Sequence, residues 1–306
     1  MTTIQIISVP AGLVFAPFLL GVINRTKAFF AGRNGPPICQ AYYDLFKLLK
    51  KGAVYSRTTT MVFRAAPSIN LAAVMCALVL VPVYGSAAPV SFSGDLILFA
   101  YSLGLMRFFT VAAALDTGSS FEGMGASREV QFSALAEPAL IMALAALARL
   151  SDSLSLTGAY AGVHGSSWLS AGPALGLVCV ALLIVFLAEN SRIPVDDPNT
   201  HLELTMIHEV MILDYSGPDL AFVLYGASLK IWVLGALIVN TALSFLSLDS
   251  TSAFAVFLLG MIILAVIVGV IESAMARLSL LKVPHLLIGA MMFAVLAFTL
   301  VVRSTL

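Results

Sequence analysis

The 306-residue chain is 60% hydrophobic and 10% charged, against roughly 25% charged in a typical soluble domain. Its mean hydropathy is +1.02, and its formal net charge of zero decides nothing by itself. This composition excludes a soluble globular protein and predicts an all-α, polytopic membrane protein that is surrounded by a lipid bilayer and binds no nucleic acid.

Eight apolar runs approach the roughly 20 residues that one helical span requires. They are residues Ile4 to Ile23, Ala65 to Tyr84, Asp95 to Leu115, Phe132 to Leu150, Gly172 to Leu187, Pro218 to Phe245, Ala253 to Ile271 and Pro284 to Val302. The first run lacks the basic segment of a signal peptide, so we expect it to remain as a span. Since no connection is long enough to fold by itself, we expect a single integral membrane domain over residues 1–306.

The connection between the first two runs carries a basic excess, which marks the cytoplasmic side of a membrane protein. Its basic residues are Arg25, Lys27, Arg33, Lys47, Lys50, Lys51, Arg57 and Arg64. Only Asp44 opposes them. An even number of spans then makes both termini extracytoplasmic, and it places residues 116–131, 189–217 and 272–283 on the cytoplasmic side.

That first connection also contains an amphipathic segment, GPPICQAYYDLFKLLKK. Its apolar residues recur at helical spacing, and its two prolines suit a helix start. The pattern predicts a cytoplasmic-side helix that lies in the membrane interface. Its apolar face could rest in lipid as an anchor, or it could seal a cavity entrance between spans.

The second cytoplasmic connection reads LDTGSSFEGMGASREVQFSALAEPAL. Gly118, Gly123 and Gly125 permit tight backbone turns, and four charged residues crowd the same interval. The charged residues are Asp116, Glu122, Arg128 and Glu129. We expect a packed loop that faces a partner subunit.

Two charged residues lie deep inside apolar runs. Glu137 precedes Pro138 in the fourth run, and Lys230 lies near the middle of the sixth. A charge near the bilayer centre costs on the order of 3 kcal/mol on insertion scales, so each needs a reason. Glu137 is either part of an ion path or a neutral, hydrogen-bonded structural residue. Arg107, in the third run, and Lys230 could each be a counter-ion of the acids. Arg107 is closer to the end of its run and could simply reach the surface, and Glu272 could be only an interfacial charge.

The third cytoplasmic connection is rich in acids and predicts a funnel for cations, most simply protons. From Ala188 onward these acids are Glu189, Asp196, Asp197, Glu203, Glu209, Asp214 and Asp219. Two prolines interrupt it, and residues 199–213 then predict a helix with His201, Thr205 and His208 on one face. Such histidines could relay protons, ligate a metal or pack as ordinary polar residues.

We expect no metal, no cofactor and no catalytic residue in this chain. The three cysteines stand alone at Cys39, Cys76 and Cys179, without the paired spacing of a zinc or iron–sulfur site. The two histidines of the third connection also lack the spacing of a zinc-binding helix.

Taken together, the loops resemble the complex I subunit 1 family, over nearly the whole chain. The segments LDTGSSFEGMGASRE with EPALI, GPPICQAYYDLFKLLKK and ESAMARL are similar to those of one branch, the membrane anchor subunits of formate hydrogenlyase-type, group 4 NiFe hydrogenases. In the third connection the family pattern is matched by Arg192, Pro194, Asp196, Glu203 and the turn Asp214-Tyr215-Ser216-Gly217.

The third connection also departs from the family. Asn199 and His201 stand where acids are usual, and about three extra residues lie between Leu204 and Asp214, so its acid path is partly rewired or lost. The resemblance implies a subunit of a bacterial or archaeal cytoplasmic membrane that holds no cofactor itself. It implies an iron–sulfur small subunit with 4Fe-4S clusters, a hydrogenase-like large subunit with a Ni-Fe site, and antiporter-like membrane subunits as neighbours.

We therefore expect a membrane subunit that links a peripheral redox arm to an ion-translocating arm and conducts protons or sodium ions. The ion-path candidates are Glu137, Glu189, Asp196, His201, Glu203, His208, Glu209, Asp214, Lys230 and Glu272. The candidates for partner docking are Asp44, Lys47, Asp116, Glu122, Arg128, Glu129 and Arg192. The alternatives are a quinone-site subunit of NADH:quinone oxidoreductase, a non-redox cation transporter and a passive scaffold. The sequence shows no internal repeat of the kind that many transporters have, which argues against the transporter.

Overall fold

The computed structural model describes residues 3–196, 206–246 and 248–305, and these residues form helices and no strand. Eight long helices are apolar enough to cross a membrane. They are α1 (Thr3–Phe30), α3 (Met61–Leu80), α4 (Asp95–Asp116), α5 (Ser120–Ser151), α7 (Gly165–Glu189), α8 (Gly217–Leu243), α9 (Ser250–Ala274) and α10 (Val283–Thr305). The prediction of an all-α membrane protein with eight spans is confirmed.

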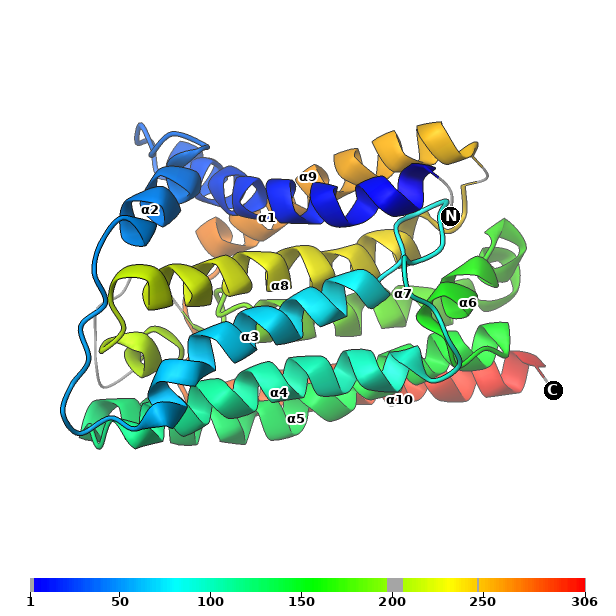
Figure 1. Ribbon diagram of the computed structural model, residues 1–306. Helices are drawn as coiled ribbons and strands as arrows, with labels where there is room; N and C mark the ends of the chain where they lie inside the picture. The colour runs from blue at the N-terminus through cyan, green and yellow to red at the C-terminus, as the bar shows by residue number, and fades with distance from the viewer. Residues whose placement is uncertain (1–2, 197–205, 247, 306) are drawn as a thin grey trace.

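Helix α8 runs through the middle of the bundle, with α1 and α9 on one side and α3, α4, α5 and α10 on the other (Figure 1). Its most apolar window is 78% buried, whereas those of α9 and α10 are 33% and 28% buried. Apolar faces of the outer helices are therefore left for lipid or for neighbouring subunits. Any polar side chain on α8 has to find its partners within the protein.

The predicted amphipathic helix is present as α2 (Gln40–Leu49), which lies beside the ends of α1 and α8 (Figure 1). None of its residues is buried, and Phe46 and Lys47 both lie exposed on its surface. We call this end of the bundle the α2 end and the opposite end the far end. Helix α1 begins and α10 ends at the far end, as an even number of spans requires.

The second connection is shorter than expected, because α4 ends at Asp116 and α5 begins at Ser120. Gly118 makes the turn in the left-handed region, with φ +71°. The prediction of a loop with turns at Gly123 and Gly125 is wrong. Both glycines are helical, and at Gly125 an added Cβ would lie 2.9 Å from the carbonyl oxygen of Ile207, so the helix continues here against residues 206–211.

The third connection contains little helix in its described part. Only η1 (Glu209–Ile212), a single 3-10 turn, forms there, so the predicted helix is wrong for residues 206–208 and 213. The backbone N–H groups of Ile207 and His208 donate to the side chain of Asp196, at 3.1 and 3.2 Å, instead of to carbonyl oxygens of a helix. Residues 197–205, with His201 and Glu203, lie outside the described part of the chain.

At the far end the link expected at residues 151–171 is partly helical. A short helix, α6 (Leu156–Ala161), forms there, and α7 already begins at Gly165. Helix α7 is kinked at Ala171, whose φ is −125°, one residue before the apolar run predicted from the sequence begins.

Candidate functional site: a buried ion-pair network

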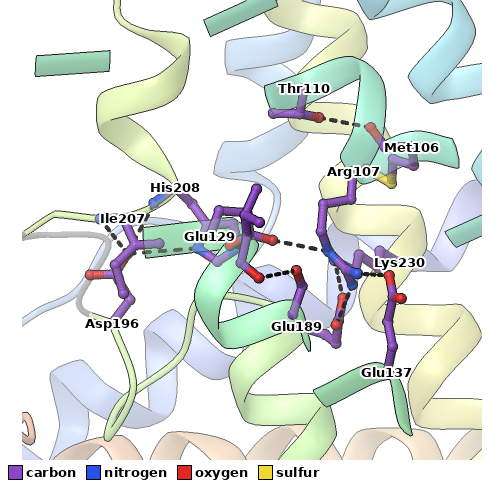
Figure 2. A network of polar contacts seen from close by, with 12 residues as sticks. Met106, Arg107, Thr110, Glu129, Glu137, Glu189, Asp196, Ile207, His208 and Lys230 are labelled. Carbon is purple, nitrogen blue, oxygen red and sulfur yellow. Dashed lines mark hydrogen bonds and ion pairs between the residues drawn. The ribbon is translucent and has the colours of Figure 1, made fainter. Parts of the chain in front are cut away.

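Arg107 lies at the centre of a network of ion pairs inside the bundle (Figure 2). It projects from α4, is 8% exposed, and pairs with three carboxylates. Its Nε donates to Glu129 of α5 at 3.1 Å, and its two terminal nitrogens donate to Glu137 of α5 and Glu189 of α7. Arginine suits this position because its planar guanidinium carries several donors in fixed directions.

Lys230 of α8 extends the network toward the middle of the bundle. Its Nζ lies 2.7 Å from Oε2 of Glu189, whose Oε1 accepts from Arg107. Glu189 is the last residue of α7, and 4% of its side chain is exposed. This carboxylate therefore pairs with cations from two other helices. Lys230 is deep in the bundle, as predicted, and Glu189 is its counter-ion.

In the other direction, Glu129 connects Arg107 to the third connection. Its Oε2 lies 3.1 Å from Nε2 of His208, and Nδ1 of His208 lies 3.7 Å from Oδ2 of Asp196. Asp196 in turn pairs with Arg277, which follows α9, at 3.0 Å. The network thus joins four cationic side chains and four carboxylates.

Histidine 208 is held as a cation by its two acidic neighbours. Burial alone would lower its pKa, but the charge of Glu129 and the nearby carboxylate of Asp196 outweigh burial and raise the pKa from 6.5 to about 9. Burial also opposes the charge of Asp196, yet its contacts with His208 lower the pKa of that carboxyl. The pair is therefore charged at neutral pH, although histidine is the side chain that most readily changes charge there.

A cavity of about 330 Å³ opens beside the network. Arg107, Glu189 and Lys230 line its charged side, while α1, α2 and α8 supply apolar walls that include Leu20 and Leu45. The network is consequently in contact with a space large enough for several water molecules or an amphiphilic molecule.

A second, smaller cluster lies at the α2 end. Glu272 of α9 has a fully buried carboxylate that lies 2.7 Å from Nζ of Lys27 and 3.4 Å from Nη1 of Arg192. Lys27 belongs to α1, and Arg192 follows α7. Glu272 is therefore inside the protein, whereas the sequence also allowed an interfacial charge.

Several predicted residues lie outside both clusters. Glu122 is buried and accepts the backbone N–H of Asp214 at 3.2 Å. Asp116 accepts from the backbone N–H of Thr60 at 2.7 Å and so anchors the start of α3. Asp44 and Glu209 line the cavity beside the network, and Arg128 donates to the carbonyl oxygen of Met206 at 2.8 Å.

The sequence placed one of these residues differently. Glu129 was expected in a partner-facing loop, yet it lies on the same helix as Glu137, eight residues earlier, and faces the same arginine. For Arg107 the sequence allowed either a position that reaches the surface or a counter-ion of the acids, and the structure shows the counter-ion. The spacing of the two glutamates, close to two helical turns, was the signal available for an internal cation.

The described part of the chain contains no group of three or more histidine, cysteine, aspartate or glutamate side chains that could hold a metal ion. Charges in the network are instead balanced by arginine, lysine and histidine. What this arrangement can do chemically is hold protons or bind and release cations along a line of side chains, since breaking one pair leaves an alternative partner nearby.

Comparison with known proteins gives a consistent result. The family model described as NADH dehydrogenase matches residues 2–303. The chain is 31% identical over 279 residues to hydrogenase-4 component C of Escherichia coli K12, covering 89% of this chain and 87% of that protein. It is 30% identical over 289 residues to formate hydrogenlyase subunit 4 of the same organism, covering 92% and 93%.

A solved structure has the same fold. It is that of the membrane-bound sulfane sulfur reductase, an archaeal respiratory membrane complex, and a chain in it superposes with a TM-score of 0.80. The match covers 97% of this chain and 98% of that one at 18% identity. At this identity the likeness concerns the fold alone.

Proposed function

This chain belongs to the NADH dehydrogenase family, and on that premise we propose that it is a membrane subunit of a formate hydrogenlyase-type hydrogenase complex. Its similarity over most of its length to two named hydrogenase subunits supports this proposal. We further propose that it forms one integral membrane domain, holds no cofactor, and adjoins subunits that carry 4Fe-4S clusters and a Ni-Fe site.

The ion-pair network supports a role in ion movement. Buried charged side chains are costly, so a network of eight charged groups from Arg277 to Lys230, most of them buried, supports a role beyond stability. The single observation that carries the proposal is that Glu129 joins His208, at the α2 end, to Arg107 and Glu189 inside the bundle. Protons or sodium ions could enter from the third connection and reach the centre through these contacts.

Glu137 provides the sharpest test of this role. Its side chain is 45% exposed, so Glu137→Gln leaves Arg107 with two buried carboxylates and should not prevent assembly. We expect normal subunit abundance on a native gel, together with loss of proton or sodium uptake by membrane vesicles when the redox substrate is supplied. The amide keeps the shape of the side chain but can neither carry the charge nor release a proton.

The matched control is Asp152→Asn. Asp152 directly follows the C-terminal end of α5, is exposed, and pairs with Arg149. The same carboxylate-to-amide change there should leave uptake unaltered. Normal abundance with unchanged uptake in Glu137→Gln would remove Glu137 from the path and make it a structural residue.

We also propose an orientation in which the α2 end faces the cytoplasm, where the redox subunits would dock. The basic residues between α1 and α3 support it. Cysteine labelling of Lys50 and Ser166 variants from each side of the membrane tests it. Labelling of both positions from one face would contradict the span count, and labelling of Ser166 from the cytoplasm would reverse the orientation.

A quinone-site subunit is a second candidate function, because the cavity beside the network combines apolar walls with a charged inner side. That shape suits a molecule with a polar head and an apolar tail. Quinone-dependent oxidation of the donor by the purified complex distinguishes the two. An activity that is lost in a cavity-filling variant such as Ala227→Phe would favour the quinone reading, and its absence from the wild-type complex would exclude it.

A further inference from the structure

A second cavity, of about 430 Å³, lies at the far end of the bundle, away from the ion-pair network. Pro82 beyond α3, Tyr160 of α6, and Asn240 and Ser244 at the end of α8 line it. Figure 1 shows α6 and the C-terminal part of α8 at the far end. No aspartate, glutamate, lysine or arginine is among the described residues that line it.

Asn240 is one of the lining residues, and its side-chain oxygen is buried. The side chain is 2% exposed, and its Nδ2 donates to the carbonyl oxygen of Pro82 at 2.7 Å. Because that carbonyl can only accept, the orientation of the amide is determined, and Oδ1 has to be on the other side. Oδ1 has no hydrogen-bond partner within the described residues. A buried acceptor without a donor costs about 1–3 kcal/mol, so a ligand that supplies positive charge or a proton is favoured here.

Tyr84, Ser86, Tyr160 and Ser244 line the cavity and donate to backbone carbonyls, and Thr157 accepts the backbone N–H of Ala88 at 3.0 Å. Burial raises the pKa of the Tyr160 phenol, which stays neutral and protonated. With these hydrogens engaged, the lining offers lone pairs of neutral oxygen atoms.

Helix ends add to this acceptor character. Helices α3, α6 and α8 all end beside the cavity, with C-caps at Val81, Gly162 and Ser244. The C-terminal end of a helix carries a partial negative charge. The start of α7 has the opposite polarity, but there the side chain of His164 accepts the backbone N–H of Ser167. The potential at the cavity therefore favours a cation.

We propose that the far-end cavity binds a monovalent cation through neutral oxygen ligands, led by Oδ1 of Asn240. Carbonyl and hydroxyl oxygens can replace the hydration shell of such an ion, and backbone carbonyls at helix C-terminal ends do so in ion-binding membrane proteins. Divalent cations are disfavoured because they usually require carboxylates. Anions are disfavoured because the described lining contains no lysine or arginine.

The site does not depend on the proposed redox function, since binding requires no electron transfer. It nevertheless lies on the same helix as Lys230. Asn240 is ten residues further along α8, about 15 Å at 1.5 Å per residue. Buried apolar side chains including Val233, Leu234 and Leu237 separate the two positions. The cation site is consequently distinct from the ion-pair network.

Sodium-23 relaxation on the purified native complex tests the proposal, with choline chloride keeping the ionic strength constant. We expect saturable line broadening by the wild-type complex that potassium reverses and equimolar magnesium does not. Asn240→Leu should lower the bound fraction at least fivefold, and Asn240→Asp should raise it because a carboxylate holds a cation more strongly. Asn70→Leu, the same change at a buried asparagine of α3, should leave the broadening unaltered.

Equal broadening by the wild-type and Asn240→Leu complexes would overturn the proposal, as would displacement of sodium by magnesium. Should Asn240→Leu fail to assemble, Asn240→Asp and Ser244→Ala carry the test. An unchanged sodium affinity in both variants would then refute the site. Because the measurement records binding alone, it stands or falls separately from the vesicle uptake that tests Glu137.

Discussion

Two buried polar regions lie along α8 and satisfy their polar groups by opposite means. Around Lys230 every described member of the network is charged and has a partner of opposite sign. Around Asn240 the groups are neutral oxygens, and one acceptor has no partner within the described residues. A buried unpaired charge costs several kcal/mol, whereas a buried unpaired neutral acceptor costs about 1–3 kcal/mol. Only the neutral region can therefore contain a polar group without a partner at a small cost in stability.

This difference also separates the functions that the regions suit. Paired charges can exchange partners, which favours passage of ions or protons along the network. A neutral cavity with an unpartnered acceptor favours reversible occupancy by a ligand that arrives from outside. The comparison therefore predicts that substitutions in the network affect assembly most strongly, while substitutions at the far end are mild.

The largest expected effect is that of Arg107→Met. The variant would leave Glu129, Glu137 and Glu189 without their shared cation. Breaking a buried ion pair costs about 3–5 kcal/mol, a large part of the 5–15 kcal/mol that stabilises a typical protein. We expect the subunit to be strongly depleted from membranes, measured by quantitative immunoblotting of a tagged chain.

Arg149→Met is the control for that experiment. Arg149 pairs with Asp152, and the two side chains are 38% and 84% exposed. Exposed pairs contribute about 0–1 kcal/mol, so abundance should stay near the wild-type level. Equal depletion of both variants would mean that loss of arginine itself, and not of a buried pair, causes the effect.

The stability that the network provides should depend on pH. The far-end cavity should not share this dependence, because its described lining contains no aspartate or glutamate beside a histidine. The pKa of His208 is about 9 in the folded chain and 6.5 otherwise. Its charge therefore stabilises the folded state fully below pH 6.5, and the contribution is lost as the pH rises to 9. Allowing for the 24% exposure of the side chain, we expect about 2 kcal/mol to be lost.

Thermal unfolding of the purified complex between pH 6 and 10 measures this loss. The His208→Gln variant should unfold earlier at pH 6 and show a flatter profile up to pH 9. His285→Gln is the matched control, since the His285 side chain is exposed and its Nδ1 contacts the carbonyl oxygen of Leu281. A His208→Gln profile as steep as that of the wild type would place the titrating group elsewhere.

The smallest effect is expected at the far end, for Ser244→Ala. The serine hydroxyl donates to Thr241 and accepts from Nε1 of Trp168 at 2.8 Å. Losing these neutral hydrogen bonds should cost about 1 kcal/mol without reducing redox-driven ion uptake. Ser170→Ala, which removes an exposed hydroxyl bonded only within α7, should have less effect on the unfolding temperature. Depletion as severe as in Arg107→Met would contradict the distinction between the two regions.

The sequence predicted the candidate site only in part. It identified Glu137 and Lys230 as residues too costly to bury without a reason, and it grouped Glu189, Asp196 and His208 in one connection. It did not predict that Arg107 would pair with three acids, because those acids come from α5 and α7. It also assigned Glu129 to a loop, because the glycines at positions 123 and 125 suggested turns, whereas both are helical and Gly125 packs closely against Ile207 and Val210.

The sequence by itself determined the number of spans, the amphipathic helix and the all-α class, because hydropathy and helical periodicity depend on residues near one another in the chain. Tertiary structure alone decided the pairing of charges. Arg107, Glu189 and Lys230 lie on three different helices, and only the packing of those helices brings them within contact distance. The orientation of Asn240 was decided in the same way, by the carbonyl oxygen of Pro82 on a distant segment. Electrostatic and hydrogen-bond energies depend on such distances, and local sequence does not specify them.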